Sequence, residues 1–305
     1  MKIVTLTLSC AFDIHCTADK LTVNHENLAS IVSCDAGGKG INISRALTKF
    51  GVENTAVAVL GDENGDSFER ALKNEGIALY PIWDKGRIRE NITVHTDDGK
   101  ETRLSFRGSP ASDGVFQKVT EALRTLCDCE TLLTVTGRVP DGIELGAVKT
   151  LIKELSEKGV KVVIDSRSFT LADLVESKPY LIKPNEEEIE SYMGRSVSGK
   201  DEAEIAAKEL HALGIENVMI SLGGDGAVIV SRDGTYYQKA PKIAPISTIG
   251  AGDSSIAGFI MGLSLGEDIP GALKRAIAFG SGACLTPGTN PPIPDDVYIL
   301  MKEMS

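Results

Sequence analysis

The sequence predicts an α/β protein whose mainly parallel central sheet is covered by helices on both faces and carries a small β lid. Short, apolar and β-branched runs alternate along the chain with amphipathic stretches of helix length, which is typical of parallel sheets with helical crossovers. Two more polar segments, roughly residues 10–34 and 82–108, break this alternation and have the period-2 pattern of strands. We expect these two segments to form the lid.

The strand and helix candidates succeed one another in a regular order. The strand-like runs are Lys2–Ser9, Thr131–Thr136, Lys161–Asp165, Tyr180–Lys183 and Val218–Ser221. The helix-length stretches between several of them are Gly114–Leu126, Gly142–Lys158, Glu186–Met193 and Asp201–Leu213. In the second polar segment, the turn "DDGK" at 97–100 predicts a hairpin and hence a small antiparallel unit. No linker rich in Pro, Gly or Ser divides the chain, so we expect residues 1–305 to form one domain.

The composition has an acidic balance that excludes several classes of partner. The 305 residues include 32 Lys and Arg against 43 Asp and Glu, and the resulting net charge of −11 argues against broad nucleic-acid or anionic-membrane binding. No apolar run approaches the roughly 20 residues of a membrane helix, and the N-terminus lacks the features of a signal peptide. The six cysteines have no zinc or redox spacing. We expect a cytoplasmic protein with no nucleic-acid and no membrane partner.

The segment "STIGAGDSSIAGFIMGL" at 247–263 predicts an anion site. Gly250, Ala251 and Gly252 carry little or no side chain and precede an amphipathic helix, so their backbone N–H groups would point at a bound anion. Asp253 ends this turn, where it can accept a proton from a hydroxyl while the amides hold a transferred phosphoryl group. The alternative interpretation is that Asp253 only caps the helix and the glycines form a tight turn.

A second glycine-rich turn, "DAGGKGINISRAL" at 35–47, also leads into a helix. Gly37, Gly38 and Gly40 allow close backbone approach, Lys39 offers a charge, and Asn42 can hydrogen-bond a polyol. The pattern is neither a P-loop nor a dinucleotide-binding turn. On local grounds it is equally a ligand loop or a simple helix start.

Two further segments point to a nucleotide. In "LIKPNEEEIESYMG", Asn185 and Glu188 are three residues apart and share a helix face, which suits magnesium held through water. The alternative is an acidic first turn that offsets the helix dipole. In "SLGGDGAVIV", a glycine turn joins two strands and would let the backbone approach a nucleotide, or it is a plain hairpin turning at Asp225-Gly226.

These four segments, in this order, resemble the PfkB (ribokinase-like) family of carbohydrate kinases over nearly the whole chain. The two family signatures are present as "AGGKGINISRAL" at 36–47 and "STIGAGD" at 247–253. The Lys in "GGKG", the "LIKPNEEE" stretch and "ACLTPGT" at 283–289 are most similar to the phosphosugar branch. The resemblance implies a ribokinase-like three-layer fold with a β lid, and a homodimer formed through that lid.

The resemblance also implies roles for individual residues. It makes Asp253 the catalytic base and Gly250, Ala251 and Gly252 the anion hole. The implied sugar-side residues are Asp13, Gly37, Gly38, Lys39 and Asn42, with Arg89 and Asn91 as the lid element that reaches the substrate phosphate. The implied nucleotide-side residues are Lys183, Asn185, Ser221, Gly223 and Gly226, with Ser281, Gly282 and Gly288 near the adenine pocket and Glu188 as the magnesium residue, acting through water.

The activity implied is Mg²⁺-dependent transfer of a phosphoryl group from ATP to a phosphosugar. The specific expectation is that fructose 1-phosphate is converted to fructose 1,6-bisphosphate. The alternatives are tagatose 6-phosphate, fructose 6-phosphate, an unphosphorylated sugar or a nucleoside as acceptor, or a binding protein without turnover. Where the branch has "N-P-x-x-D" and "S-G-S-L-P", this chain has "SCAFD" and "TGRVP", which puts Arg138 beside the sugar. Arg107 in "SFRGSP" is a further added charge, and both arginines either bind the substrate or face solvent.

Overall fold

The central sheet of the computed structural model, which describes residues 1–304, has nine strands. They are β1 (Lys2–Thr7), β4 (Thr55–Gly61), β5 (Leu79–Asp84), β8 (Thr131–Thr136), β9 (Lys161–Asp165), β10 (Leu181–Ile182), β11 (Asn217–Ser221), β12 (Ala227–Ser231) and β13 (Gly234–Gln238). Their order is β13-β12-β11-β10-β9-β8-β1-β4-β5. All neighbours from β11 to β5 are parallel, whereas β12 and β13 are antiparallel at one edge. The prediction of a mainly parallel sheet is confirmed.

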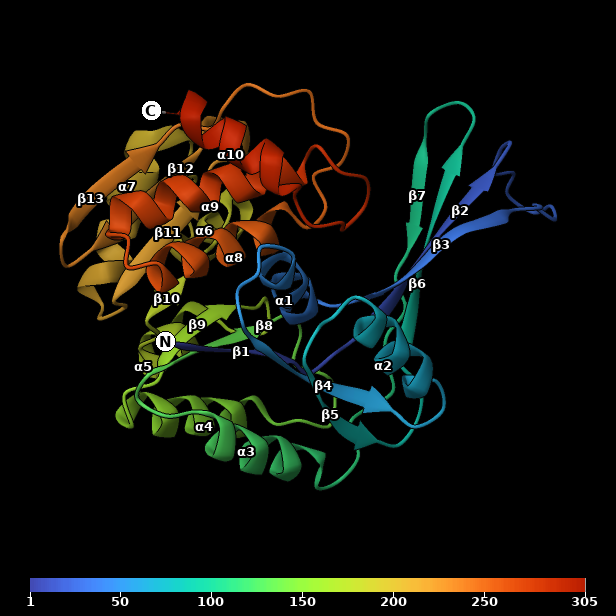
Figure 1. Ribbon diagram of the computed structural model, residues 1–305, viewed down its shortest axis with the longest axis horizontal. Helices are drawn as coiled ribbons and strands as arrows, with labels where there is room; N and C mark the ends of the chain where they lie inside the picture. The colour runs from blue at the N-terminus through green and yellow to red at the C-terminus, as the bar shows by residue number, and fades with distance from the viewer. Residues whose placement is uncertain (305) are drawn as a thin grey trace.

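Helices cover both faces of this sheet (Figure 1). One face carries α3 (Val115–Leu126), α4 (Leu145–Glu157), α5 (Leu171–Ser177), α6 (Glu186–Met193) and α7 (Gly199–Ala212). The other carries α1 (Lys39–Lys49), α2 (Gly65–Asn74), α8 (Ala251–Ser264), α9 (Ile269–Ala283) and α10 (Pro294–Glu303). Side chains alternate across each strand, so Val4 and Leu6 of β1 pack toward α3 and α4 while Ile3 packs toward α8 and α9. The sheet is therefore buried on both faces.

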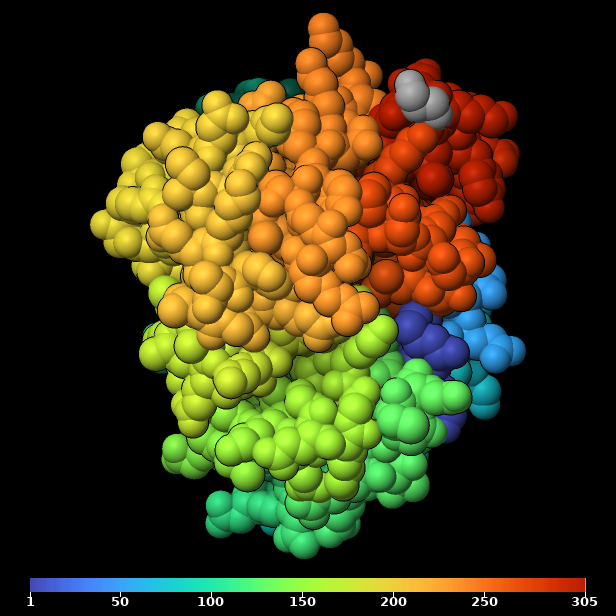
Figure 2. Space-filling model, turned by 90° about the vertical axis from the view of Figure 1, so that its left-hand side faces the viewer, coloured from blue at the N-terminus to red at the C-terminus, as the bar shows by residue number. Residues whose placement is uncertain are grey.

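The lid is a separate four-stranded sheet in the order β3-β2-β6-β7, and it projects from the body at the right of Figure 1. Its strands are β2 (Ala11–Ala18), β3 (Ser30–Gly37), β6 (Arg89–Thr96) and β7 (Glu101–Leu104). The hairpin expected at 97–100 joins β6 to β7 and is confirmed. Figure 2 shows the face of the molecule opposite the lid, where the yellow to red C-terminal segments lie above the green ones.

Two features of the lid differ from the prediction. The expected antiparallel unit is a mixed sheet, because its central pair, β2 and β6, is parallel. Both strands leave the carboxyl edge of the central sheet, after β1 and β5, and run outward together, while β3 and β7 return as hairpin partners. The boundaries differ too: residues 82–84 belong to β5 of the central sheet, and β3 continues to Gly37.

In residues 1–304 we find no helix long and apolar enough to cross a membrane.

Candidate active site

A cleft of about 1090 Å³ opens between the carboxyl edge of the central sheet and the lid. Its walls come from the ends of β1, β8, β9, β10 and β11, from the N-terminus of α8, from α1 and from the lid. Fourteen of the predicted site residues line it: Asp13, Gly38, Lys39, Asn42, Arg89, Asn91, Arg138, Lys183, Asn185, Glu188, Ser221, Gly250, Gly252 and Asp253. Residues separated by as many as 240 positions are thus brought to one site.

Asp253 is a buried carboxylate in the first turn of α8. Asn42 Nδ2 of α1 donates a hydrogen bond of 2.8 Å to Asp253 Oδ2, which fixes the orientation of the carboxylate. Burial raises the pKa of Asp253 to about 6; Asp165 also raises it, whereas Lys39, Lys183 and the Asn42 bond lower it. A carboxylate with a pKa near neutrality is suited to accept a proton as a general base.

The turn before Asp253 has the geometry of an anion site. Gly250 has φ 80°, a left-handed conformation that favours glycine, and it caps α8 at the end where the helix dipole is positive. A Cβ at Gly252 would lie 3.2 Å from Lys183 Nζ, so the ammonium of this buried lysine lies beside the turn. Backbone amides and an ammonium group together can hold a phosphoryl group.

Lys39 and Asp165 form an ion pair across the cleft floor, with Lys39 Nζ 2.9 Å from Asp165 Oδ2. Burial opposes ionisation of Asp165, but the ammonium groups of Lys183 and Lys39 outweigh it and hold its pKa below the usual value. The carboxylate therefore stays charged and keeps Lys39 at the cleft. Asp165 therefore attracts both Lys39, which it contacts, and Lys183, which lies beside the second glycine-rich turn.

Three arginines line the lid end of the cleft, and one of them, Arg103, pairs with Asp13, while Arg138 lies 3.5 Å from the exposed Asp141. Asp13 Oδ1 accepts hydrogen bonds from Asn91 Nδ2 (2.9 Å) and Arg103 Nη2 (3.0 Å). Arg89 and Arg138 line the same part of the cleft, and burial lowers the pKa of Arg89, helped by both other arginines and opposed by Asp13. Arg89 Nε and Asn91 Oδ1 are buried without a hydrogen-bond partner within residues 1–304. Unpaired buried polar atoms are costly, and a bound ligand would satisfy them.

At the other end of the cleft, Asn185 and Glu188 start α6 as a reciprocal capping box. Glu188 N donates to Asn185 Oδ1 at 2.8 Å, and Asn185 N donates to Glu188 Oε2 at 3.2 Å. Glu188 Oε1 accepts a 3.0 Å bond from Arg167 Nε. Asn185 is thus the cap that precedes the helix rather than part of its face, and both residues line the cleft.

Eight predicted site residues do not line the cleft. Gly37 supports it indirectly, because a Cβ there would lie 2.8 Å from Asp13 Oδ2. Arg107 is exposed and does not line the cleft, so in this structure it takes the solvent-facing alternative of the two that the sequence left open. Gly226 turns the β11–β12 hairpin, where a Cβ would lie 2.0 Å from Gln238 O, and Gly282 packs α9 against Pro292. The remaining four are Ala251, Gly223, Ser281 and Gly288, of which Gly288 lines a neighbouring hollow beside the lid.

Sequence reasoning missed three charged residues of the cleft, Arg103, Asp165 and Arg167. Asp165 is the last residue of β9 and Arg167 follows it by two positions, so the rule that ligands bind beyond strand ends would have found both. Arg103 lies on β7 opposite Thr93 of β6, and its position depends on a strand register that the sequence does not reveal. The smaller lining residues that were missed are Ser9, Ala11, Gly137, Ser168, Ile249 and Thr289.

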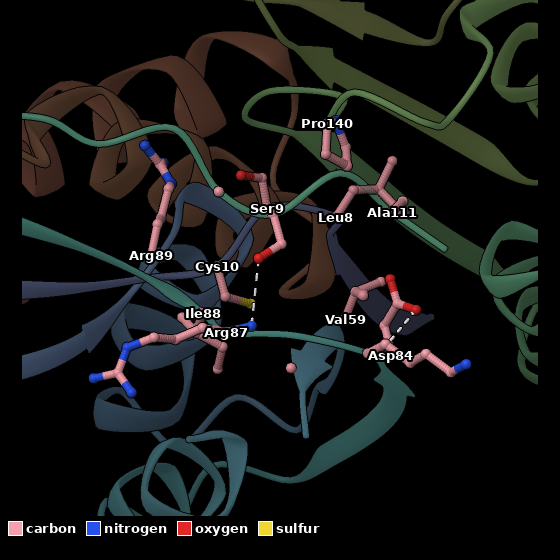
Figure 3. Close-up of a pocket in the computed structure, with 14 residues that line it drawn as sticks. Leu8, Ser9, Cys10, Val59, Asp84, Arg87, Ile88, Arg89, Ala111 and Pro140 are labelled. Atoms are coloured by element: carbon pink, nitrogen blue, oxygen red, sulfur yellow. Dashed lines mark hydrogen bonds between the residues drawn. The ribbon is translucent and has the colours of Figure 1, made fainter. Parts of the chain in front are cut away.

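A small second pocket of about 50 Å³ lies where the chain crosses between the body and the lid (Figure 3). Three of the four crossings contribute to it, through Leu8–Cys10, residues 85–88 and residues 108–111. Arg87 N donates a hydrogen bond of 3.4 Å to Ser109 Oγ, which joins two of the crossings. Arg89 lines both this pocket and the main cleft. The packing of these crossings, which we call the lid hinge, therefore positions the backbone of Arg89.

The two-sheet architecture is the ribokinase-like fold, in which a lid sheet stands over the carboxyl edge of a parallel sheet. The model of the family "pfkB family carbohydrate kinase" matches residues 2–296. The chain therefore belongs to the pfkB family of carbohydrate kinases and is an ATP-dependent carbohydrate kinase. The family predicted from the four motifs is confirmed.

Its relatives include named phosphofructokinases. The 1-phosphofructokinase of Haemophilus influenzae is 32% identical over 284 residues, 92% of this chain and 90% of that protein. The 1-phosphofructokinase of Escherichia coli K12 is 31% identical over 278 residues, 91% and 89% of the two chains. Among solved structures, Escherichia coli phosphofructokinase-2 with substrates and products has a TM-score of 0.93 at 25% identity, covering 100% and 99%. Its tetrameric inhibited form has a TM-score of 0.88 at 24% identity, with 99% of each chain covered.

Proposed function

We propose that this kinase phosphorylates a phosphosugar, with fructose 1-phosphate as acceptor and fructose 1,6-bisphosphate as product. The observation that carries the proposal is the group of Arg89, Arg103 and Arg138 at the lid end of the cleft, opposite the nucleotide end. Asp13 pairs with Arg103 and the exposed Asp141 lies 3.5 Å from Arg138, but within residues 1–304 neither carboxylate forms an ion pair with Arg89. A phosphate group would neutralise the positive charge that remains. The naming of the Haemophilus influenzae and Escherichia coli relatives supports the same acceptor.

The transfer uses groups from both ends of the cleft. Asp253 accepts the proton of the acceptor hydroxyl as that oxygen attacks the γ-phosphorus of ATP, and the bond from phosphorus to the ADP oxygen breaks. The turn 250–252 and Lys183 hold the charge that develops on the transferred group. Asp13 and Asn91 are polar partners for sugar hydroxyls, because Asn91 Oδ1 is otherwise unsatisfied. We propose that residues 1–305 work as one domain, since the lid and body share this cleft.

We propose that Mg²⁺ accompanies ATP at the Glu188 end of the cleft. The donors there fit the ion: Glu188 and Asp165 offer carboxylate oxygens to the same cavity, and magnesium takes one or two carboxylates while keeping several waters. Within residues 1–304 no three His, Cys, Asp or Glu side chains form a metal cage, so the remaining ligands of the ion would be water and phosphate oxygens. When bound, the ion would neutralise charge on the nucleotide phosphates.

The test of the acceptor is a coupled ADP-release assay with ATP and Mg²⁺. The panel comprises fructose 1-phosphate, fructose 6-phosphate, tagatose 6-phosphate, free fructose, ribose and nucleosides. We expect the highest kcat/KM for fructose 1-phosphate. A higher value for either other phosphosugar would keep the phosphosugar site but change the acceptor. A higher value for a free sugar or nucleoside would overturn the proposal.

We propose that two copies of the chain pair through their lids. Leu104 of β7 is 51% exposed and Ile31 of β3 is 70% exposed on the lid face that also carries Cys16 and Val94. β3 and β7 are edge strands, so their free backbone groups can pair with another chain. The tetrameric form of the Escherichia coli protein shows that such a fold can associate.

For this pairing we expect a dimer in light scattering after gel filtration, and a monomer for Leu104→Glu, because a charge on the apolar lid face opposes its burial. Leu213→Glu is the matched control, since Leu213 is 49% exposed at the end of α7, far from the lid. A monomeric parent chain, or a Leu104→Glu variant that stays dimeric, would contradict the proposal.

A further inference from the structure

We propose that the guanidinium of Arg167 binds the Glu188 carboxylate and competes for it with the magnesium ion that accompanies the nucleotide. The inference rests on the proposed function only in taking Glu188 as the metal-side carboxylate. Arg167 follows β9 and lines both the main cleft and an adjoining hollow of about 400 Å³ that contains Glu187 and Glu188. It therefore stands where the nucleotide end of the cleft opens to solvent.

Glu188 is held in place by the fold. Its side chain is 15% exposed, and Oε2 is fixed by the capping box through Asn185 N. The other oxygen, Oε1, is the one that Arg167 Nε binds at 3.0 Å. Both oxygens thus accept a hydrogen bond. The donor to Oε2 is a backbone N–H, whereas the donor to Oε1 is the side chain of Arg167. A hydrated cation would have to share Oε1 with the guanidinium or replace it.

Arg167 is free to move because most of it is in solvent. Its side chain is 68% exposed, and its second partner, Glu187, is 81% exposed at a distance of 3.3 Å from Arg167 Nη2 to Glu187 Oε2. Exposed ion pairs of this kind are weak, since water screens the charges and ordering two side chains costs entropy. The guanidinium would give up this weak contact and its bond to Glu188 when a divalent ion arrives, and water would solvate it because the Arg167 side chain is already mostly exposed.

The charge of Arg167 still matters to that ion. With the guanidinium in place, the negative charge of Glu188 is neutralised, so the local attraction for a divalent cation is reduced. Removing the guanidinium would leave an unpaired carboxylate at the cleft wall. Arg167 consequently lowers the metal affinity of this end of the cleft and sets the magnesium concentration that the kinase needs.

The test replaces Arg167 with Gln and measures Mn²⁺ binding by electron paramagnetic resonance, with a non-hydrolysable ATP analogue and without sugar. We expect Arg167→Gln to bind Mn²⁺ about two- to five-fold more tightly, the range that corresponds to an exposed ion pair. The magnesium concentration for half-maximal ADP release should fall by a similar factor. Arg167→Lys should lie closer to the parent, and Glu188→Gln should bind Mn²⁺ more weakly.

The matched control is Arg124→Gln, which removes the same charge from an exposed Arg–Glu pair on α3 and α4. It should leave Mn²⁺ binding unchanged. Unchanged or weaker Mn²⁺ binding in Arg167→Gln would overturn the inference, and weaker binding of the analogue in EDTA would show that Arg167 contacts phosphate instead. A kinase inactive with every phosphosugar would refute the proposed acceptor, whereas the Mn²⁺ measurement would still decide the role of Arg167.

Discussion

Replacing Asp253 with Asn is expected to lower kcat by at least about 10²-fold, because general-base catalysis typically contributes 10²- to 10⁴-fold. Asn keeps the size of the side chain and an oxygen that can accept the 2.8 Å bond from Asn42. It cannot take the proton of the acceptor hydroxyl. Binding of ATP should change little, because the 250–252 turn and Lys183 remain. The measurement is kcat and KM in the coupled assay.

The stability of this variant is its control. Since the pKa of Asp253 is raised above its ordinary value of 3.8 to about 6, the folded protein loses stability as the pH rises from 3.8 to about 6, and the loss is complete above that pH. The amide that replaces the carboxylate has no charge to bury, so at pH 7.5 the melting temperature of Asp253→Asn should equal or exceed that of the parent. If Asp253→Asn melts at a lower temperature than the parent, its lower kcat would be explained by a destabilised fold and not by loss of the base. Near-parental turnover in a well-folded variant would refute the assignment of the base.

The same pKa predicts the pH dependence of the parent enzyme. Only the ionised carboxylate can accept a proton, so kcat should fall as the pH drops below about 6 and should be level above it until another group titrates. In Asp253→Asn the residual rate should lack this acidic limb. An acidic limb that persists unchanged in the variant would assign it to a different group.

The fold class could be predicted from the sequence because each strand and helix has its own hydrophobic periodicity, which can be recognised without knowing its neighbours in space. The predicted helix at 186–193 has the observed limits of α6, and the others differ by a few residues at their ends. The parallel pairing of β2 with β6 could not be foreseen, since it depends on two crossings from distant parts of the body. The limit of β5 was misplaced because Ile82 has the same alternation as the lid strands, although it pairs with Val59 in the central sheet.

The candidate site was predictable where a motif is contiguous and unpredictable where it depends on register. Gly250, Gly252 and Asp253 are neighbours in sequence, and the structure places all three in the cleft. Arg107 was expected either at the substrate or in solvent; it lies beyond the end of β7 at Leu104 and is exposed, whereas Arg103 on β7 lines the cleft and donates to Asp13. The hairpin register, which turns Arg103 toward Asp13, sets which arginine of the segment enters the cleft.

Replacing Arg89 with Ala is expected to reduce kcat/KM for fructose 1-phosphate by about 10- to 100-fold, mostly through KM. The guanidinium is half-buried in the cleft, and its Nε is without a partner within residues 1–304. A charge-assisted hydrogen bond to a phosphate contributes roughly 1.5 to 3 kcal/mol, which corresponds to this range. Arg103 is engaged by Asp13, so it would not replace the lost contact.

The decisive quantity is the ratio of kcat/KM for fructose 1-phosphate to that for free fructose. Free fructose has no phosphate for Arg89, so its value should change by less than a few-fold and the ratio should narrow. Arg107→Ala is the matched control: it removes an exposed arginine of the same lid region that does not line the cleft, and should leave the ratio unchanged. An equal loss for both sugars in Arg89→Ala would make Arg89 a structural residue of the lid hinge, where it also lines the small pocket. A narrowed ratio in Arg107→Ala would mean that the lid closes further over the substrate than the structure shows, bringing that arginine onto the phosphate.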